Sequence, residues 1–483
     1  MFFVSALIGC RNEELFVEAE SFSVKGGWQV DQQFMDMMGS PYLIAHGAGV
    51  PVEDASAQVR LPGKGEWHLF VRTFNWVSPW YDGEGPGKFK VAVDGDELSE
   101  TLGAAGSKWM WQYAGSFETA SRNISVALKD MTGFDGRCDA LYFSRVKNPE
   151  LPEDVAGMRE LRSRLIRNFN VPSDKGQYDL VVAGGGVAGM CAAVAAARQG
   201  LKVALIHDRP VLGGNNSAEV RVHLGGSIEC GPYPNLGNMI KEFGHTKKGN
   251  AKSAENYEDW KKMSFVENEE NISLFLNTHV TDLEMKDGFI EALLARNIET
   301  GELMRFSAPV FSDCTGDASV GYLAGAEWRT GRESLAETGE PGAVEVADRQ
   351  VLGASVQWNS KDMGKPSPFP VFEYGKVFTE ESVQKVKGGE WTWETGMLRD
   401  QVLEAERVRD HGLLVVYSNW SYLKNHSSVK EEFADRALDW VAYVAGKRES
   451  RRLLGDVILC EQDLLEAKKY DDASFTTTWG MDL

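Results

Sequence analysis

The sequence predicts an α/β Rossmann-like nucleotide-binding domain preceded by an all-β sandwich. Three observations support this fold class. Short alternating strands separated by turn residues run from 16 to 146, a strand–glycine turn–helix–strand unit begins at Tyr178, and helical stretches dominate the region after Gly353. Many short strands in series are typical of a sandwich, whereas parallel strands joined by helices are typical of a doubly wound sheet. We therefore expect at least two domains of different class.

The β module is expected over residues 16–146. Its turns, PGKG, EGPGK and DGDE, separate alternating runs, and Asp-Gly tolerates the positive φ of a tight hairpin turn. The expected strands are Ala57–Leu61, Glu66–Phe74, Lys88–Val93, Asn123–Leu128 and Ala140–Phe143. Strands at this spacing favour an antiparallel sandwich. In the loop NWVSPWYDG, the rings of Trp76, Trp80 and Tyr81 can stack on a sugar, or they can pack on the second domain.

A linker is expected over residues 147–177, with a basic amphipathic helix at Met158–Arg167 that acts as a solvated brace between domains. The nucleotide-binding unit follows at once. The sequence predicts a buried strand at Leu180–Ala183 and a helix rich in alanine at Met190–Gln199. It also predicts a second strand at Val203–Ile206, which ends beside an acid. This context makes the glycine motif between them a credible dinucleotide fingerprint.

Each glycine of the G-x-G-x-x-G motif has its own expected role. Gly184 allows the tight turn, Gly186 lets backbone N–H groups approach a pyrophosphate, and Gly189 lets the helix sit close to the strand. The helix N-terminus then faces the anion. The ribose acid is expected to be Asp208, because His207 stands where a glutamate is common.

Three later features favour FAD over a nicotinamide cofactor. A second Gly-Gly loop, from Gly213 to Ser217, comes soon after the ribose acid. The run Ile272–Val280 reads as an apolar strand whose end can offer a backbone amide to adenine. The segment VFSDCTGD places Gly316 and Asp317 after another strand. We therefore expect a pyrophosphate and flavin site assembled from several loops.

The strings ALIHDRPVLGGNNSAEVRV, DCTGDASVGYLAGAEWRTGRES and GKRESRRLLGDVILCEQDLL resemble the FAD-dependent oxidoreductase family of bacterial polysaccharide-processing loci, a glutathione-reductase-like group. The resemblance implies an FAD-binding domain over 178–352 and an inserted substrate domain beginning at 353. Such proteins usually continue beyond the equivalent of Leu483, so we expect the region 353–483 to be incomplete at its end. The expected cofactor-binding residues are Gly184, Gly185, Gly186, Val187, Ala188, Gly189, Asp208, Arg209, Gly213, Gly214, Asn215, Asn216, Ser217, Val280, Gly316 and Asp317.

The segments FVEAESF and CDALYFSR resemble sandwich-type carbohydrate-binding modules. In those modules, a glutamate near the start and an aspartate near the end hold a structural calcium. The matching positions here are Glu18, Glu20 and Asp139, and oxygen ligands from both chain ends would suit Ca²⁺. The resemblance therefore implies a calcium site in the N-terminal module.

Catalytic groups are expected directly after the second Gly-Gly loop. Alternation there predicts a strand that places Glu219, Arg221 and His223 on one face. We expect His223 to act as the base, since imidazole titrates near neutral pH, and Arg221 to stabilise negative charge near the flavin. A hydrogen-bonded structural role is the alternative for His223.

In the C-terminal region, helices are expected at Leu398–His411 and Val429–Val444. The arginines at 448, 451 and 452 can bind an anionic substrate, although pairing with nearby acids is favoured. The expected function is oxidation of a hydroxyl of a carbohydrate or glycoside by FAD. There are two alternatives. One is a surface glycan-binding protein with a degenerate flavin domain, and the other is a flavin-linked isomerase or hydratase without net redox change.

Composition limits the partners. A net charge of −20 argues against nucleic acid, because no basic stripe is present to meet phosphates. No apolar run reaches the length of a membrane span. The cysteines form no C-x-x-C pair or zinc cluster, and we expect buried thiols at positions 10, 138, 191, 230, 314 and 460.

The first residues, MFFVSALIGC, end in the form of a bacterial lipoprotein cleavage box, although they lack the basic start of a signal peptide. We therefore expect residues 1–15 to be the remnant of an export signal in a periplasmic or lipid-anchored protein. Membrane attachment is expected only through Cys10. A frayed N-terminus in a cytoplasmic protein is the alternative.

Overall fold

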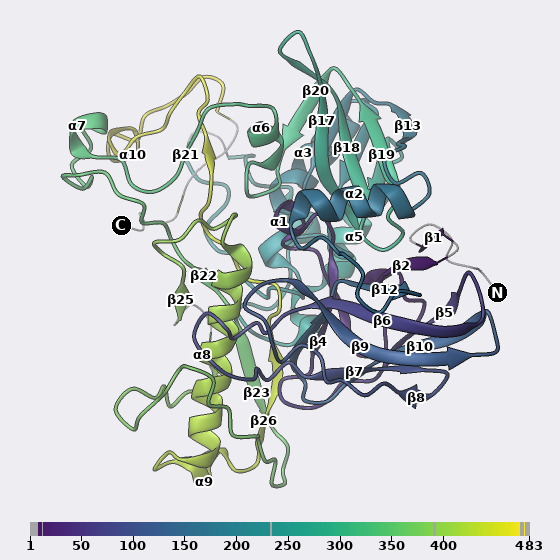
Figure 1. The fold of residues 1–483 in the computed structure, drawn as a ribbon. Helices are drawn as coiled ribbons and strands as arrows, with labels where there is room; N and C mark the ends of the chain where they lie inside the picture. The colour runs from purple at the N-terminus through teal and green to yellow at the C-terminus, as the bar shows by residue number, and fades with distance from the viewer. Residues whose placement is uncertain (1–7, 12, 232–233, 390–392, 474–477, 479–483) are drawn as a thin grey trace.

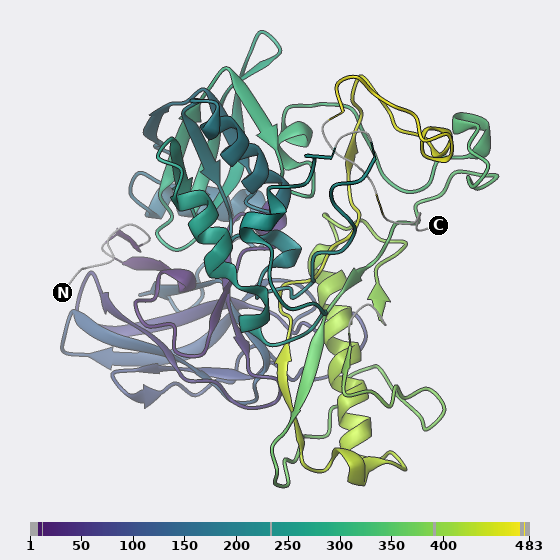
Figure 2. The same cartoon turned by 180° about the vertical axis from the view of Figure 1, so that it is seen from behind.

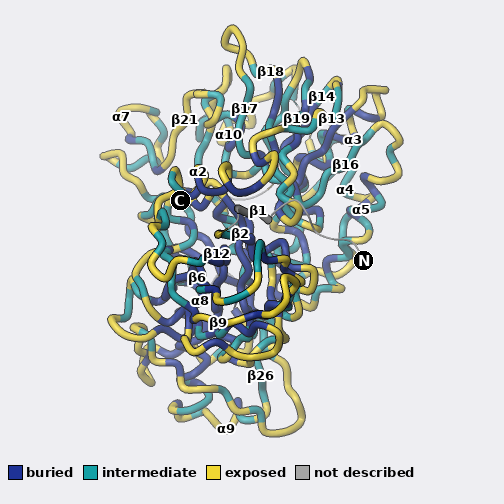
Figure 3. Tube along the Cα trace, turned by 45° about the vertical axis from the view of Figure 1, so that its right-hand side comes forward, coloured by how far each residue is buried: buried dark blue, intermediate teal, exposed yellow. Residues whose placement is uncertain are grey.

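The computed structural model describes residues 8–11, 13–231, 234–389, 393–473 and 478. Figure 1 shows three parts: a β-rich N-terminal module, an α/β part above it, and a C-terminal region whose long helix α8 runs beside the module. The reverse view in Figure 2 shows the same arrangement. Figure 3 shows that the buried segments run through the inner part of the molecule, where these parts meet. No described helix is long and apolar enough to cross a membrane.

The N-terminal module is all-β, as the alternating runs predicted. A five-stranded sheet of order β1-β2-β12-β6-β9 faces a four-stranded sheet β5-β10-β7-β8 and a three-stranded sheet β11-β4-β3. Trp28, Trp67 and Phe89 lie in the fully buried core of this module. Its elements are β1 (Ile8–Arg11), β2 (Glu14–Glu18), η1 (Ala19–Ser21), β3 (Gln29–Asp31), α1 (Met35–Met38), β4 (Tyr42–His46), β5 (Ala55–Arg60), β6 (Gly65–Thr73), β7 (Phe89–Val93), β8 (Asp96–Glu97), β9 (Met110–Thr119), β10 (Asn123–Asp130), β11 (Phe134–Cys138) and β12 (Ala140–Ser144).

The segment expected as a linker is largely built into the two domains. Helix α2 (Val155–Leu165) begins at Asp154, whose side chain accepts a hydrogen bond from the Gly157 amide. The apolar side of α2 packs on residues of β2 and β12. Strand β13 (Ser173–Gln177) pairs in parallel with β19 (Leu303–Ser307) of the α/β part. The expectation of a solvated helix is wrong for Arg162, which is 1% exposed.

The α/β part contains a parallel four-stranded sheet of order β16-β15-β14-β20. Helices α3 and α5 cover one face of it, and the mixed sheet β13-β19-β18-β17 packs on the other. Strand and helix alternate along the chain, which is the Rossmann-type pattern that the fingerprint predicted. The elements are β14 (Leu180–Ala183), α3 (Val187–Arg198), β15 (Val203–Ile206), η2 (Gly214–Asn216), α4 (Ile240–Phe243), η3 (Ala254–Tyr257), α5 (Asp259–Glu267), β16 (Ile272–Phe275), β17 (Thr278–Lys286), β18 (Phe289–Asn297), β20 (Val310–Asp313) and α6 (Ser319–Leu323).

Two sequence expectations fail here for local reasons. The single strand expected at Ile272–Val280 is two strands in different sheets, because Asn277 adopts a left-handed conformation with φ of 52°. The strand expected after the second Gly-Gly loop does not form. Arg221 also has a positive φ, of 65°, and its amide donates to the Ser217 carbonyl at 2.8 Å, which closes a turn. Glu219, Arg221 and His223 therefore do not share a strand face.

The C-terminal region packs against the β module through a shared core. Trp358, Tyr417 and Trp420 from this region join Trp76 and Phe134 of the module in one buried cluster. Helix α8 starts later and ends later than expected, and the second expected helix shortens to one turn followed by a strand. The elements are β21 (Trp328–Arg329), α7 (Leu335–Thr338), β22 (Ala354–Ser355), β23 (Trp358–Asp362), β24 (Gly388–Gly389), β25 (Glu394–Thr395), α8 (Ala405–Asn425), α9 (Lys430–Phe433), β26 (Arg436–Val441), β27 (Arg452–Leu453) and α10 (Glu461–Leu465).

Candidate functional site

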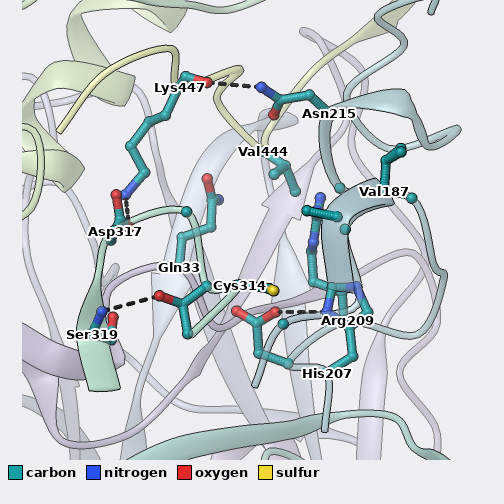
Figure 4. A pocket seen from close by; sticks show the side chains of 18 of the residues that line it. Gln33, Val187, His207, Arg209, Asn215, Cys314, Asp317, Ser319, Val444 and Lys447 are labelled. Carbon is teal, nitrogen blue, oxygen red and sulfur yellow. Dashed lines mark hydrogen bonds and ion pairs between the residues drawn. The ribbon is translucent and has the colours of Figure 1, made fainter. Parts of the chain in front are cut away.

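A cavity of about 450 Å³ lies at the carboxyl ends of the parallel strands. In an open α/β sheet this edge is where ligands bind. Figure 4 shows that its walls come from all three parts of the molecule. The lining residues that had been expected to bind the cofactor are Gly184, Gly186, Val187, Ala188, Asp208, Arg209, Gly213, Gly214, Asn215, Asn216, Val280, Gly316 and Asp317. Gly185, Gly189 and Ser217 lie behind this surface.

The three fingerprint glycines occupy three different environments. Gly184 has a φ of 103°, and a Cβ there would lie 2.1 Å from the Cys314 carbonyl oxygen. A Cβ on Gly189 would lie 1.8 Å from the Gly184 oxygen, so the start of α3 packs directly on the turn. By contrast, a Cβ on Gly186 would meet nothing closer than the Gly214 Cα, at 3.9 Å. The space in front of Gly186 is therefore open, at the N-terminus of α3, where an anion would bind.

The second Gly-Gly loop lies directly against the first. The Gly213 amide donates to the Gly185 carbonyl at 2.9 Å. Asn215 extends from this loop and donates from Nδ2 to the Lys447 carbonyl at 2.7 Å (Figure 4). Asn216 donates to the Val222 carbonyl, while Ser217 is fully buried and closes the loop through its amide. The loop thus joins the nucleotide-binding turn to the C-terminal segment.

His207 supports the turn, and Asp208 faces the cavity. The Gly185 amide donates to His207 Nδ1 at 3.0 Å, so Nε2 carries the proton and donates to the Val211 carbonyl. Burial lowers the pKa of His207 to about 4 and keeps the ring neutral. Burial alone would raise the pKa of Asp208, but the neighbouring His279, His207 and Arg209 hold it well below its usual range. Asp208 is therefore an ionised acceptor for a hydroxyl group.

The turn after β20 forms the opposite wall. Asp313 accepts hydrogen bonds from the Thr315 amide and hydroxyl and from the Gly321 amide, which fixes the turn. Asp317 is paired with the Lys447 ammonium group, as Figure 4 shows. Lys447 was not anticipated, although it lies in the string GKRESRRLLGD. Its position depends on the packing of a segment that is distant in sequence.

The arginines that follow Lys447 are engaged within the protein. Arg448 pairs with Glu394, and Arg452 pairs with Glu449 and with Glu333. Arg451 lies over the Tyr322 ring at 3.7 Å. Pairing with nearby acids, which was the favoured interpretation, is therefore confirmed for Arg448 and Arg452, whereas Arg451 stacks on the Tyr322 and Trp328 rings.

The two residues expected to act in catalysis are placed differently. His223 lines the cavity, and both its backbone amide and its Nδ1 contact Asn250 Oδ1, at 2.9 and 2.7 Å. Because the amide can only donate, the Asn250 atom is the oxygen and His223 Nδ1 carries a proton. Arg221 does not line the cavity. Its guanidinium stacks on the Trp440 ring at 3.8 Å and donates to backbone carbonyls.

The expected calcium ligands form an ion-pair cluster instead. Arg162 donates to Glu18 Oε1 at 2.5 Å and to both oxygens of Asp139 at 3.2 Å. Arg72 adds a second guanidinium on Asp139 at 2.8 Å. Glu20 is also buried. Among the described residues, no group of three or more histidine, cysteine, aspartate or glutamate side chains could hold a metal ion. The calcium prediction is therefore corrected: Arg162 supplies the positive charge that these carboxylates require.

The cavity fits FAD by its own features. The backbone at Gly186 is open at the N-terminus of α3, and the ionised Asp208 and the second glycine loop line the same cavity. Arg209 Nη1 is buried without a hydrogen-bond partner among the described residues, although Glu219 lies 3.4 Å away. Anion-binding amides and a hydroxyl acceptor are what a dinucleotide requires.

Solved structures that match part of the chain include Sdh1 of Mycobacterium smegmatis in complex with UQ1, at 18% identity and TM-score 0.21, covering 30% of this chain and 34% of that chain. L-proline dehydrogenase from P. horikoshii has 20% identity and TM-score 0.20, with coverage of 30% and 24%. A family 35 carbohydrate binding module from Clostridium thermocellum has 17% identity and TM-score 0.22, with coverage of 27% and 96%. The match thus spans about a third or less of the length of the Sdh1 and L-proline dehydrogenase chains.

No curated protein matches the chain. The family model described as FAD dependent oxidoreductase matches residues 179–483, which is well over half of the chain. This match confirms the resemblance seen in the glycine loops and in the DCTGD segment. The likeness of the N-terminal module to carbohydrate-binding modules, and the link to polysaccharide loci, stay predictions. The chain therefore belongs to the FAD dependent oxidoreductase family.

Proposed function

We propose that this oxidoreductase removes a hydride from the carbon of a carbohydrate or glycoside hydroxyl group. FAD, when bound, supplies the hydride acceptor. The observation that carries the proposal is His223, which lines the cofactor cavity with Nδ1 donating to Asn250. This tautomer leaves a lone pair on Nε2, and that atom can take the hydroxyl proton as the C–H bond breaks.

The remaining cavity residues would hold the cofactor. The amides around Gly186 and the start of α3 would bind the pyrophosphate, and Asp208 would accept hydrogen bonds from the ribose hydroxyls. Gly213, Gly214 and Gly316 offer backbone without side-chain bulk. Lys447 and Asp317, paired with each other, place a hydrogen-bond donor and an acceptor at the cavity wall.

A second cavity supports a saccharide as the substrate class. It measures about 540 Å³, and Trp393, Glu394, His411, Ser382 and Lys376 contribute to its lining. One face of Trp393 stacks on Trp358 at an interplanar angle of 10°. The apolar face of a sugar ring can pack on an aromatic ring while neighbouring polar groups bind its hydroxyls. Glu394 pairs with Arg448, which lines the cofactor cavity, so this ion pair stands between the two cavities.

Anaerobic reduction of the bound flavin tests the substrate class. Purified protein loaded with FAD is mixed with a panel of sugars and glycosides, with succinate and L-proline as comparison donors, and flavin absorbance is followed. We expect bleaching by at least one saccharide and none by the comparison donors. Bleaching only by a non-sugar donor would overturn the carbohydrate substrate. A protein that takes up no FAD would overturn the whole proposal.

His223→Asn tests the proton acceptor. Asparagine keeps an N–H near the position of Nδ1 but has no basic nitrogen, so flavin reduction by the active donor is expected to slow by about 10²- to 10⁴-fold. The absorbance spectrum and the affinity for FAD should stay unchanged. His68→Asn, in the β module beside Tyr113, is the matched control and should retain full rate. An unchanged rate in His223→Asn would assign His223 the structural role.

We also propose that the protein is exported and anchored to a membrane only through a lipid on Cys10, with a carbohydrate as its partner. The support is the cleavage-box pattern that ends at Cys10. Residues 1–7 lie outside the described residues, and Cys10 falls within β1. Mass spectrometry of the native protein should show a lipidated N-terminal cysteine. An intact, unmodified Met1 would contradict export by this route.

A further inference from the structure

The β module contributes directly to the cofactor cavity. Gln32, Gln33 and Asp36, from the segment between β3 and the end of α1, line it together with the glycine loops. Figure 4 shows Gln33 pointing into this space beside Asp317 and Cys314. No motif around 178–317 signals this contribution, because the three residues precede the fingerprint by about 150 positions. Their contacts define two separate connections.

The first connection runs through His279, at the start of β17. His279 Nε2 lies 3.0 Å from Asp36 Oδ1, and Nδ1 lies 3.8 Å from Asp208 Oδ2. Burial would lower the pKa of His279, but the two carboxylates outweigh it and raise the pKa to about 10. The ring is thus a cation held between two carboxylates. One of these belongs to the β module, and the other is the expected ribose acceptor.

The second connection runs through Gln33. Its Nε2 donates to the Tyr443 carbonyl at 2.8 Å, and its Oε1 accepts from the Ala445 amide at 2.9 Å. The two backbone partners fix which end of the side chain is oxygen. Val444 and Ala445 line the cavity, and Lys447 follows two residues later. One side chain of the β module therefore fixes the backbone that leads to the cavity lysine.

Buried ion pairs hold the module in this position. Arg409 of α8 donates to Asp31 at 2.8 Å, and both side chains are fully buried. Arg137 of β11 binds Asp410 with two hydrogen bonds, of 2.9 and 2.6 Å. A bidentate pair in a buried contact restricts relative movement of the two parts. The module is consequently a fixed wall of the cavity and not a domain on a flexible tether.

We propose that the β module is a structural part of the cofactor site, in which Asp36 acts through His279 to position Asp208 against the adenosine ribose, and Gln33 positions the segment 443–447. Asp36 and Gln33 are positioning residues. The inference rests on the proposed placement of the ribose at Asp208. It implies that binding of FAD and docking of the module favour each other.

Asp36→Asn tests the first connection in the full chain. Asparagine keeps the size of the side chain but loses the charge that holds His279, and we expect the Kd for FAD to rise about tenfold. Asp282→Asn is the matched control, since this β17 carboxylate faces Arg159 at 3.9 Å and lies outside the cavity. The control should bind FAD as the unaltered protein does. Gln33→Ala should weaken FAD binding in the same direction.

A double-variant comparison separates positioning from general structure. If Asp36 acts through Asp208, the change Asp36→Asn should add little to the Kd of Asp208→Asn. Full additivity, or an unchanged Kd in Asp36→Asn, would overturn the positioning role. If Asp208→Asn alone leaves the Kd unchanged, the placement of the ribose fails instead. The two failures are thus distinguishable, and far-UV circular dichroism confirms that each variant is folded.

Discussion

Replacing Arg162 by methionine will lower the free energy of unfolding by about 3–5 kcal/mol, because it leaves a group of buried carboxylates without their counter-ion. Arg162 donates to Glu18 and Asp139, and all three side chains are almost completely buried. Arg72 still pairs with Asp139 in this variant. Glu18 and Glu20 therefore lose more of the positive charge that balances them than Asp139 does. Denaturant unfolding at pH 8, followed by tryptophan fluorescence, measures the loss.

The loss of unfolding free energy in Arg162→Met should become smaller as the pH falls. Burial raises the pKa of Glu18 and of Glu20, and Arg162 counteracts this effect at both residues. Without Arg162 both values rise further. A carboxyl group whose pKa is higher in the folded than in the unfolded protein destabilises the fold as the pH rises through the folded value. The variant should therefore be closer in stability to the unaltered protein at pH 5 than at pH 8.

The same helix provides the control. Arg164→Met removes a guanidinium that is 39% exposed and pairs with Glu14, and it should cost no more than about 1 kcal/mol. Adding EDTA should leave the Tm of the unaltered protein unchanged, since Arg162 occupies the place expected for calcium. Equal losses in the two arginine variants, or a lower Tm in EDTA, would contradict this account of the cluster.

The sequence predicts this molecule well wherever local chemistry decides the structure. Each of the five expected strands of the β module begins and ends within two residues of an observed strand. The turn at Gly184 and the close packing at Gly189 are as expected, because glycine at those spacings has a defined steric reason. Most of the expected cofactor residues therefore reach one cavity.

What the sequence could not predict depends on contacts between distant segments. The sequence predicted that Arg162 would lie on the surface of an amphipathic helix. Only the packed fold shows the carboxylates that surround it. Asp36 and Lys447 reach the cavity from opposite ends of the chain. The strand expected to carry Glu219, Arg221 and His223 does not form, because the Arg221 amide donates to the Ser217 carbonyl, and no alternation pattern reveals this turn.

Gly189→Ala will destabilise the α/β part even without cofactor. A Cβ at this position would lie 1.8 Å from the Gly184 carbonyl oxygen, which is backbone and cannot rotate away. Helix α3 must then move from the turn, and overpacking of this kind costs about 1–3 kcal/mol. Denaturant unfolding of the cofactor-free protein measures the effect. Gly200→Ala is not a suitable control, because Gly200 itself has a positive φ of 86°.

Gly186→Val provides the comparison within the same motif, since the space around its Cβ is open in the protein alone. Gly186 has a φ of −67°, which any residue adopts. The fold should therefore lose little stability, while the valine side chain fills the space that the pyrophosphate needs. Loss of one charge-assisted hydrogen bond costs about 1.5–3 kcal/mol, or about ten- to hundredfold in Kd for FAD. If Gly186→Val instead lost stability and kept its FAD affinity, the anion would bind elsewhere. The two glycines thus separate folding from cofactor binding within one short motif.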